Sequence, residues 1–164
     1  MTTTSEVGIT DSKMIIDEAC RTAKAFIDRF YDKVDSKRPT LAKIYLDAAT
    51  LSWNGNRIDG NWRTHFFYSG PLWYIKDNLF LGPEDIQKFY QEKLPPSSHQ
   101  IYSYDAQPVM DEFVGGQKTV VVHVGGSVKY GTERPRPFQQ NFLLTASGDF
   151  WKVATDVFRY QEPK

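Results

Sequence analysis

Apolar side chains recur every three or four positions from residue 11 to residue 34, which is the spacing of one buried stripe along an α-helix. The stripe is formed by Ile16, Ala19, Cys20, Ala23, Phe26, Ile27, Phe30, Tyr31 and Val34. Charged residues such as Asp17 and Asp28 fall on the opposite side. Propensity alone gives a helix little stability in water, so this stripe must pack against a second apolar surface. The sequence therefore predicts a long helix, capped by Asp11 or Ser12, that lies on another layer of the fold.

The remainder of the chain carries mostly β-strand patterns. Strands are predicted at residues 49–53, 57–59, 99–108, 119–130, 138–147 and 150–160, and short helices at residues 39–46 and 83–94. Helices followed by a run of antiparallel strands indicate an α+β fold rather than alternating βαβ units. Gly125 and Gly126 interrupt one predicted strand, which indicates a bulge or strong bend in a sheet that curls around a helix.

The chain shows no internal repeat and no linker that would divide it. Residues 1–10 are polar and rich in threonine, and we expect them to form a flexible tail. Residues 11–162 are predicted to form a single domain. Within it, residues 61–82 concentrate aromatic side chains without a sustained period, and we interpret this segment as an insertion that leaves the sheet face free.

Charge and cysteine content argue against several classes of protein. Lysine plus arginine and aspartate plus glutamate number 20 each, so the basic excess typical of a direct nucleic-acid binder is missing. No run of about 18 apolar residues would span a membrane. Cys20 is the single cysteine, so no intramolecular disulfide can form, and a reducing intracellular compartment is the simplest expectation.

Several segments, taken in their order and spacing, point to a known family. They are Asp17–Arg21, Leu41–Tyr45, Ala49–Asn56, Leu94–Pro95, Asp105–Val109, Gly126–Lys129, Phe138–Ala146 and Trp151–Tyr160. Together they resemble the nuclear transport factor two-like family, and within it the small export-related subunits. The resemblance covers about residues 14–60 and 83–162, and residues 61–82 depart from the family pattern. It implies a cone-shaped fold in which a strongly bent antiparallel sheet wraps a long N-terminal helix.

The same resemblance implies a non-catalytic subunit that pairs, through its sheet face, with the large messenger-RNA export receptor. That heterodimer carries ribonucleoprotein through nuclear pores lined with Phe-Gly repeats, which we expect this chain to meet through the complex. The implied location is the nucleus and the cytoplasm, with shuttling through the pore at the nuclear envelope. An arginine in the family's final strand forms an ion pair with a partner carboxylate, and it falls on Arg159 here.

Alternation along the final predicted strand agrees with this role for Arg159. On that strand, one face is expected to carry Val153, Thr155, Val157 and Arg159. Arginine presents a planar group that binds a carboxylate through two parallel hydrogen bonds. The neighbouring predicted strand contributes Gln139, Asn141 and Leu143 to the same partner-binding surface, and the sequence leaves open which face of that strand points outward.

Two other functions share the implied fold. One is a homodimeric import factor that binds Ran, and the other is a small-molecule dehydratase or isomerase that uses the cone pocket. An enzyme needs a converging acid–base pair, which His123 with Asp105 or Asp156 would offer. A single histidine in a strand is more often packed or solvated, and the sequence has no hydrolase, metal-binding or phosphate-binding motif. We therefore expect no catalytic residue, no metal site and no cofactor.

Overall fold

The computed structural model describes residues 4–54 and 79–161. The elements in chain order are α1 (Thr4–Ser36), the 3-10 helix η1 (Arg38–Ile44), β1 (Tyr45–Trp53), β2 (Leu79–Leu81), α3 (Pro83–Glu92), β3 (Ser97–Val109), the short 3-10 helix η3 (Asp111–Phe113), β4 (Thr119–Tyr130), β5 (Arg136–Ser147) and β6 (Phe150–Tyr160). The strands form one six-stranded sheet in the order β2-β1-β6-β5-β4-β3. β1 pairs with β6 in parallel, and the other neighbouring pairs of this sheet are antiparallel. The predicted α+β fold is confirmed.

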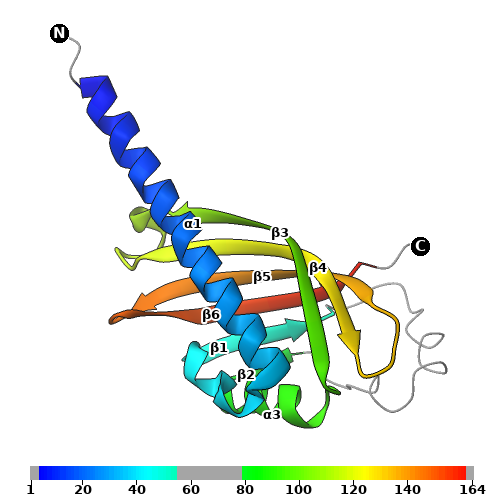
Figure 1. Ribbon diagram of the computed structural model, residues 1–164. Helices are drawn as coiled ribbons and strands as arrows, with labels where there is room; N and C mark the ends of the chain where they lie inside the picture. The colour runs from blue at the N-terminus through cyan, green and yellow to red at the C-terminus, as the bar shows by residue number, and fades with distance from the viewer. Residues whose placement is uncertain (1–3, 55–78, 162–164) are drawn as a thin grey trace, which may run out of the picture.

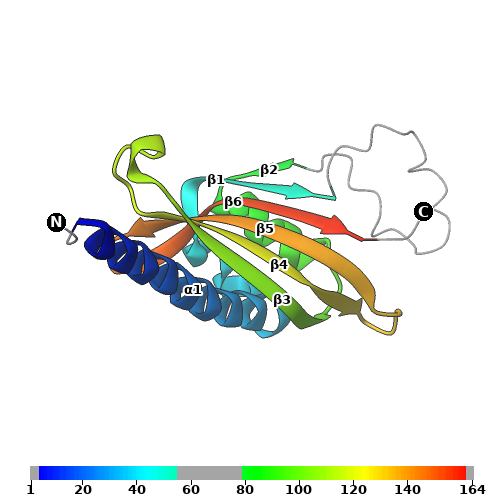
Figure 2. The same ribbon diagram turned by 90° about the horizontal axis from the view of Figure 1, so that it is seen from above.

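The long helix α1 covers one face of the bent sheet. Figure 1 shows it running diagonally across that face, with η1 and α3 beside its C-terminal end. Figure 2 shows the same layers from above, with α1 beside β3 and the strands fanning away from it. The helix begins at Thr4 rather than at the predicted cap, so residues 4–10, expected to form a flexible tail, belong to it.

Aromatic side chains from α1 fill the hollow of the sheet. Phe26 and Phe30 stack on each other with ring centroids 5.5 Å apart. Both rings meet Phe142 of β5 edge to face, at centroid distances of 4.9 and 4.8 Å. Such aromatic pairs add about 1 kcal/mol each beyond the burial of their apolar surface. This aromatic cluster fixes how the helix sits on the sheet.

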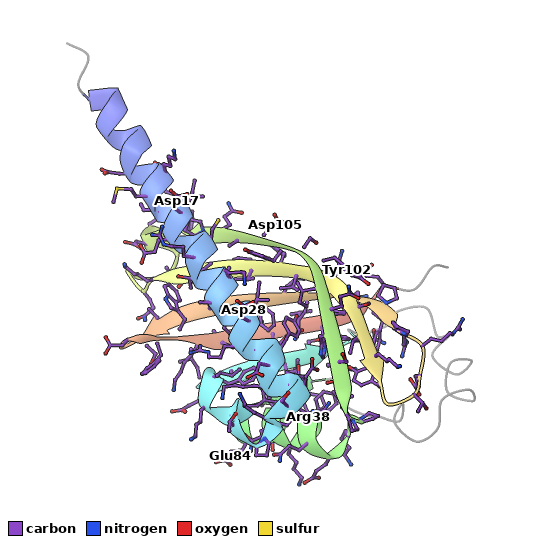
Figure 3. All side chains as sticks on the ribbon, in the orientation of Figure 1. Asp17, Asp28, Arg38, Glu84, Tyr102 and Asp105 are labelled. Atoms are coloured by element: carbon purple, nitrogen blue, oxygen red, sulfur yellow. The ribbon has the colours of Figure 1, made fainter. Side chains whose placement is uncertain are left out.

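Two members of the predicted helix stripe are not buried. Ile16 is 49% exposed, and Cys20 is exposed as well. The buried side of the helix passes through Ala19 and Ala23, one position away from Cys20. Ile16 precedes Asp17, near which α1 extends past the edge of the sheet (Figure 3). The predictions for Ile16 and Cys20 were therefore wrong. Cys20 lies beside the line of buried helix residues, and Ile16 lies next to Asp17, near which the helix leaves the sheet.

The sheet bends at the predicted glycine pair. Opposite Gly125 and Gly126 the register shifts by one residue, and Tyr102 of β3 is the extra residue of a β-bulge. A Cβ atom on Gly126 would lie 2.3 Å from the carbonyl oxygen of Gln100. Glycine is therefore required where the two backbones approach, and the bulge is confirmed with its extra residue on the neighbouring strand.

The region around the first strand differs from the prediction. β1 begins at Tyr45 rather than at residue 49, because the preceding helix is a 3-10 helix that ends at Ile44. The last part of segment 61–82, interpreted as irregular, forms the edge strand β2. Phe80 of β2 stacks on Phe89 of α3 with ring centroids 4.3 Å apart, which fixes this strand against the core. The strand predicted at 57–59 lies outside the described residues.

Arg38 joins the end of α1 to α3 and to the start of β3. Its position below α1 is labelled in Figure 3. Its guanidinium donates hydrogen bonds of 2.6–3.0 Å to the carbonyl oxygens of Val34, Tyr90, Leu94 and Pro95 and to the hydroxyl of Ser97. These acceptors belong to α1, to α3 and the residues that follow it, and to β3. Arg38 therefore fixes these parts of the fold to one another.

Candidate functional site

The side chains that point away from α1 form an exposed surface, which we call the outer face. Two rows of side chains cross all six strands on this face. One row consists of Leu81, Thr50, Thr155, Leu143, Val121 and Gln107, and the other of Leu79, Ser52, Val157, Asn141, His123 and Asp105. Every member is at least partly exposed, whereas intervening residues such as Leu51, Val122 and Phe158 are buried. The sheet therefore separates a packed inner side from a continuous, accessible outer side.

Six of the seven residues predicted to bind a partner lie side by side on the outer face. They form three cross-strand pairs, Arg159–Gln139, Val157–Asn141 and Thr155–Leu143. The register thus answers the question that the sequence left open for β5, because alternate residues of this strand point outward with those of β6. The candidate site is a patch on two central strands, with the exposed Arg159 at one end.

Val153, the seventh predicted residue, does not belong to this patch. Its exposed fraction is 0%, and it packs in the core. Leu143 pairs with Thr155 but Leu144 pairs with Val153, so Ala154 is an extra residue between them. An extra residue reverses the alternation of side chains along a strand. The prediction for Val153 was wrong because it assumed an uninterrupted period of two.

His123 lies on the outer face, where its Nδ1 atom and the Oδ1 atom of Asn141 are hydrogen-bonded at 2.7 Å. Asp156 points to the inner side and is completely buried. His123 and Asp156 therefore cannot form an acid–base pair. Asp105, labelled on β3 in Figure 3, is the cross-strand neighbour of His123, but both residues are exposed on the outer face. Neither arrangement places an acid–base pair inside the cone.

Asp156 is instead the centre of a buried polar network. Its two carboxylate oxygens accept hydrogen bonds from the Tyr45 hydroxyl at 2.8 Å and from Gln140 Nε2 at 2.7 Å. Gln140 in turn accepts a 2.8 Å hydrogen bond from the hydroxyl of Tyr31 on α1. Burial raises the pKa of Asp156 to about 7, and the two hydrogen bonds only partly oppose it. The network ties α1, β1, β5 and β6 together at the centre of the core.

A groove of about 490 Å³ lies between α1 and β3. Its acidic side chains have partners within the chain, since Asp28 pairs with Lys24 and Asp35 with His99. His99 Nδ1 lies 2.6 Å from Asp35 Oδ1, and its backbone N–H donates to Asp35 Oδ2 at 2.9 Å. Burial opposes ionisation of Asp35, but hydrogen bonds from His99 and Ser97 outweigh it and lower the pKa of this carboxyl. These contacts position β3 against the helix.

Two other features are absent from the described residues, 4–54 and 79–161. Histidine, cysteine, aspartate and glutamate do not gather there into a group of three or more that would hold a metal ion. Among the same residues, no helix is both long and apolar enough to cross a membrane.

The sequence-based prediction of the partner-binding surface did not include the side chains of β1 and β2 that lie on the outer face. Leu79 and Leu81 are 57% and 61% exposed and point outward, while Phe80 between them packs inward. The out-in-out alternation of three apolar residues was present in the sequence. The irregular pattern of residues 61–82 as a whole hides this period of two at the end of the segment.

Comparison with known proteins identifies relatives of the whole fold. The sequence pattern of the nuclear transport factor 2 (NTF2) domain family matches residues 22–160. NTF2-related export protein 1 from Bos taurus is 36% identical over 156 residues, which is 93% of this chain and 95% of that protein.

Solved structures share the same fold at low sequence identity. Nuclear transport factor 2 from Cryptosporidium parvum superposes with a TM-score of 0.66 at 21% identity, covering 88% of this chain and 95% of that chain. A chain from the Mtr2–Mex67 M domain complex of C. albicans superposes with a TM-score of 0.58 at 17% identity, again over 88% of this chain and 95% of that chain.

Proposed function

The chain belongs to the nuclear transport factor 2 (NTF2) domain family, and we propose that it is a non-catalytic subunit that heterodimerises with the large messenger-RNA export receptor. The observation that carries the proposal is the outer face, where six predicted side chains form one accessible patch on β5 and β6. The bovine relative is named an export protein, and a structural neighbour comes from a complex of two chains, Mtr2 and Mex67.

The chemistry of the patch suits a protein partner. Val157 and Leu143 supply apolar surface, and Thr155, Asn141 and Gln139 beside them supply hydrogen-bonding groups. Specific protein interfaces combine apolar contacts with direct hydrogen bonds. Arg159 is the exposed charged residue of the patch, and its planar guanidinium fits a carboxylate of the partner.

A non-catalytic role is supported by the interior of the fold. Asp156 is the carboxyl group at the centre of the core, and Tyr45 and Gln140 occupy both of its oxygens. Its exposed fraction is 0%, so a substrate has no access to it. An acid–base catalyst must reach the proton that it transfers. The network therefore supports a structural role for Asp156 rather than a dehydratase or isomerase.

The cellular role follows from the heterodimer. The complex would carry ribonucleoprotein between nucleus and cytoplasm, and contact with the Phe-Gly repeats of the pore would be made through it. The formal net charge of zero supports binding to a protein rather than directly to nucleic acid. The alternative, a homodimeric import factor that binds Ran, would use the same outer face for self-association.

Substitution of Arg159 tests the proposal. We expect Arg159→Ala to weaken binding of the receptor's NTF2-like domain about tenfold, because it leaves a partner carboxylate unpaired in the interface. Isothermal titration calorimetry measures this affinity. Arg21→Ala is the matched control, because Arg21 is an exposed arginine on α1, away from the outer face. Equal affinities for the wild type and Arg159→Ala, with the fold intact, would contradict the proposed role of Arg159.

A further inference from the structure

The edge strand β2 presents two leucines to solvent beside the proposed interface. Leu79 and Leu81 are 57% and 61% exposed, although the strand itself is fixed by Phe80 stacking on Phe89. Leu81 pairs with Thr50 of β1, and Leu79 pairs with Ser52. Their side chains therefore begin the two rows that run across the outer face to the patch on β5 and β6.

A stable interface requires a larger surface than the predicted patch provides. A specific interface buries about 800 Å² on each partner and involves about 20–30 residues a side. Six side chains on two strands are far fewer, so a partner seated on them must extend over neighbouring strands.

The outer face differs in chemistry on the two sides of the patch, toward β3 and toward β2. Toward β3 the rows pass Val121 and His123 of β4 and end in Gln107 and Asp105, which are polar or charged. Toward β2 they pass Thr50 and Ser52 and end in the two leucines. Interface centres are depleted in charged residues, and exposed apolar residues on an edge strand invite association unless they are covered.

We infer that Leu79 and Leu81 of β2 are part of the interface with the export receptor and contact an apolar cluster on the receptor's NTF2-like domain. The inference rests on the proposed heterodimer and extends its contact surface from β5 and β6 across β1 to the edge of the sheet. Leu79 and Leu81 would form a second apolar part of the interface, separated from Val157 and Leu143 by the side chains of Thr50, Ser52 and Thr155.

The test is the affinity of the double variant Leu79→Thr/Leu81→Thr for the receptor domain, measured by isothermal titration calorimetry. Threonine keeps the preference for a strand and replaces only the apolar ends of the side chains. We expect affinity to fall at least tenfold. The matched control is Ile15→Thr/Ile16→Thr, which changes two residues that are 53% and 49% exposed on α1, away from the outer face, and should leave affinity unchanged.

A second measurement uses the wild-type chain and therefore does not depend on the structure of the double variant. Hydrogen–deuterium exchange of the wild-type chain should show slower exchange of the β2 amides when the receptor domain is bound. This inference alone is overturned if the double variant binds the receptor domain with unchanged affinity. It is also overturned if the β2 amides of the wild-type chain exchange at the same rate in the complex as in the free chain. Failure of the wild-type chain to bind the receptor domain overturns the proposed function and this inference together.

Discussion

Replacing Asp156 by asparagine should stabilise the protein in neutral and alkaline solution. Asp156 is completely buried, and burial raises its pKa from 3.8 to about 7. A carboxyl group whose pKa is raised by folding favours the folded state fully below pH 3.8. That contribution is lost as the pH rises to about 7 and stays lost above it. A difference of about three pKa units corresponds to about 4 kcal/mol of folding free energy.

The expected net effect is smaller than 4 kcal/mol. The amide of the variant can accept the hydrogen bond from Gln140 and donate one to the Tyr45 hydroxyl, as a protonated Asp156 would. Its second N–H is left buried without an acceptor, which costs about 1–3 kcal/mol. Asp156→Asn should therefore raise the free energy of unfolding at pH 8 by about 2 kcal/mol. At pH 5 the advantage should disappear, because the wild-type carboxyl is then protonated in the folded state.

Urea unfolding at pH 5 and pH 8, followed by circular dichroism, measures both differences. The comparison between variant and wild type isolates Asp156, because Asp35 has a lowered pKa and shifts the pH profile in the opposite direction. Asp105→Asn, at an exposed position on the outer face, serves as the control for the loss of one carboxyl group. A variant that is less stable than wild type by the same amount at both pH values would refute the reasoning, since it would mean that Asp156 does not titrate on folding in this range.

Two further predictions concern the framework that holds the outer face. Arg38→Met should lower the free energy of unfolding by about 3 kcal/mol or more, because it leaves the carbonyl oxygens of Tyr90 and Leu94 without their donor; an unchanged urea midpoint would contradict this. Gly126→Ala should cost about 2 kcal/mol or more, because its Cβ would lie 2.3 Å from a backbone oxygen that cannot move aside. Gly125→Ala is its control in the same urea assay and should cost less, because its Cβ would lie 3.1 Å from the Ser103 hydroxyl, which can rotate.

Much of the fold was predictable because its periodicities are regular. β4 and β6 have the predicted bounds of 119–130 and 150–160, and the helix stripe from Ala19 to Val34 packs as expected apart from Cys20. The glycine pair at 125 and 126 indicated the bend, because glycine within a strand marks a bulge or a close backbone approach.

The errors arose where one extra residue or the edge of a layer breaks a period. Ala154 reverses the alternation in β6, and no residue in that stretch is a glycine or proline that would have signalled the change. Ile16 has the spacing of a core residue, but the sequence does not show where the sheet beneath the helix ends. Which face of β5 points outward depended on pairing with β6, a long-range contact that local sequence does not encode.

The proposed heterodimer requires that the outer face bind another protein chain rather than a copy of itself. Light scattering after gel filtration, on the chain alone and mixed with the NTF2-like domain of the large export receptor, distinguishes the two modes of binding. We predict a new peak with the mass of a one-to-one heterodimer, whose interface buries about 1,600 Å² or more. A stable homodimer that keeps its mass in the presence of the receptor domain would rule out the proposed heterodimer and favour the homodimeric import factor.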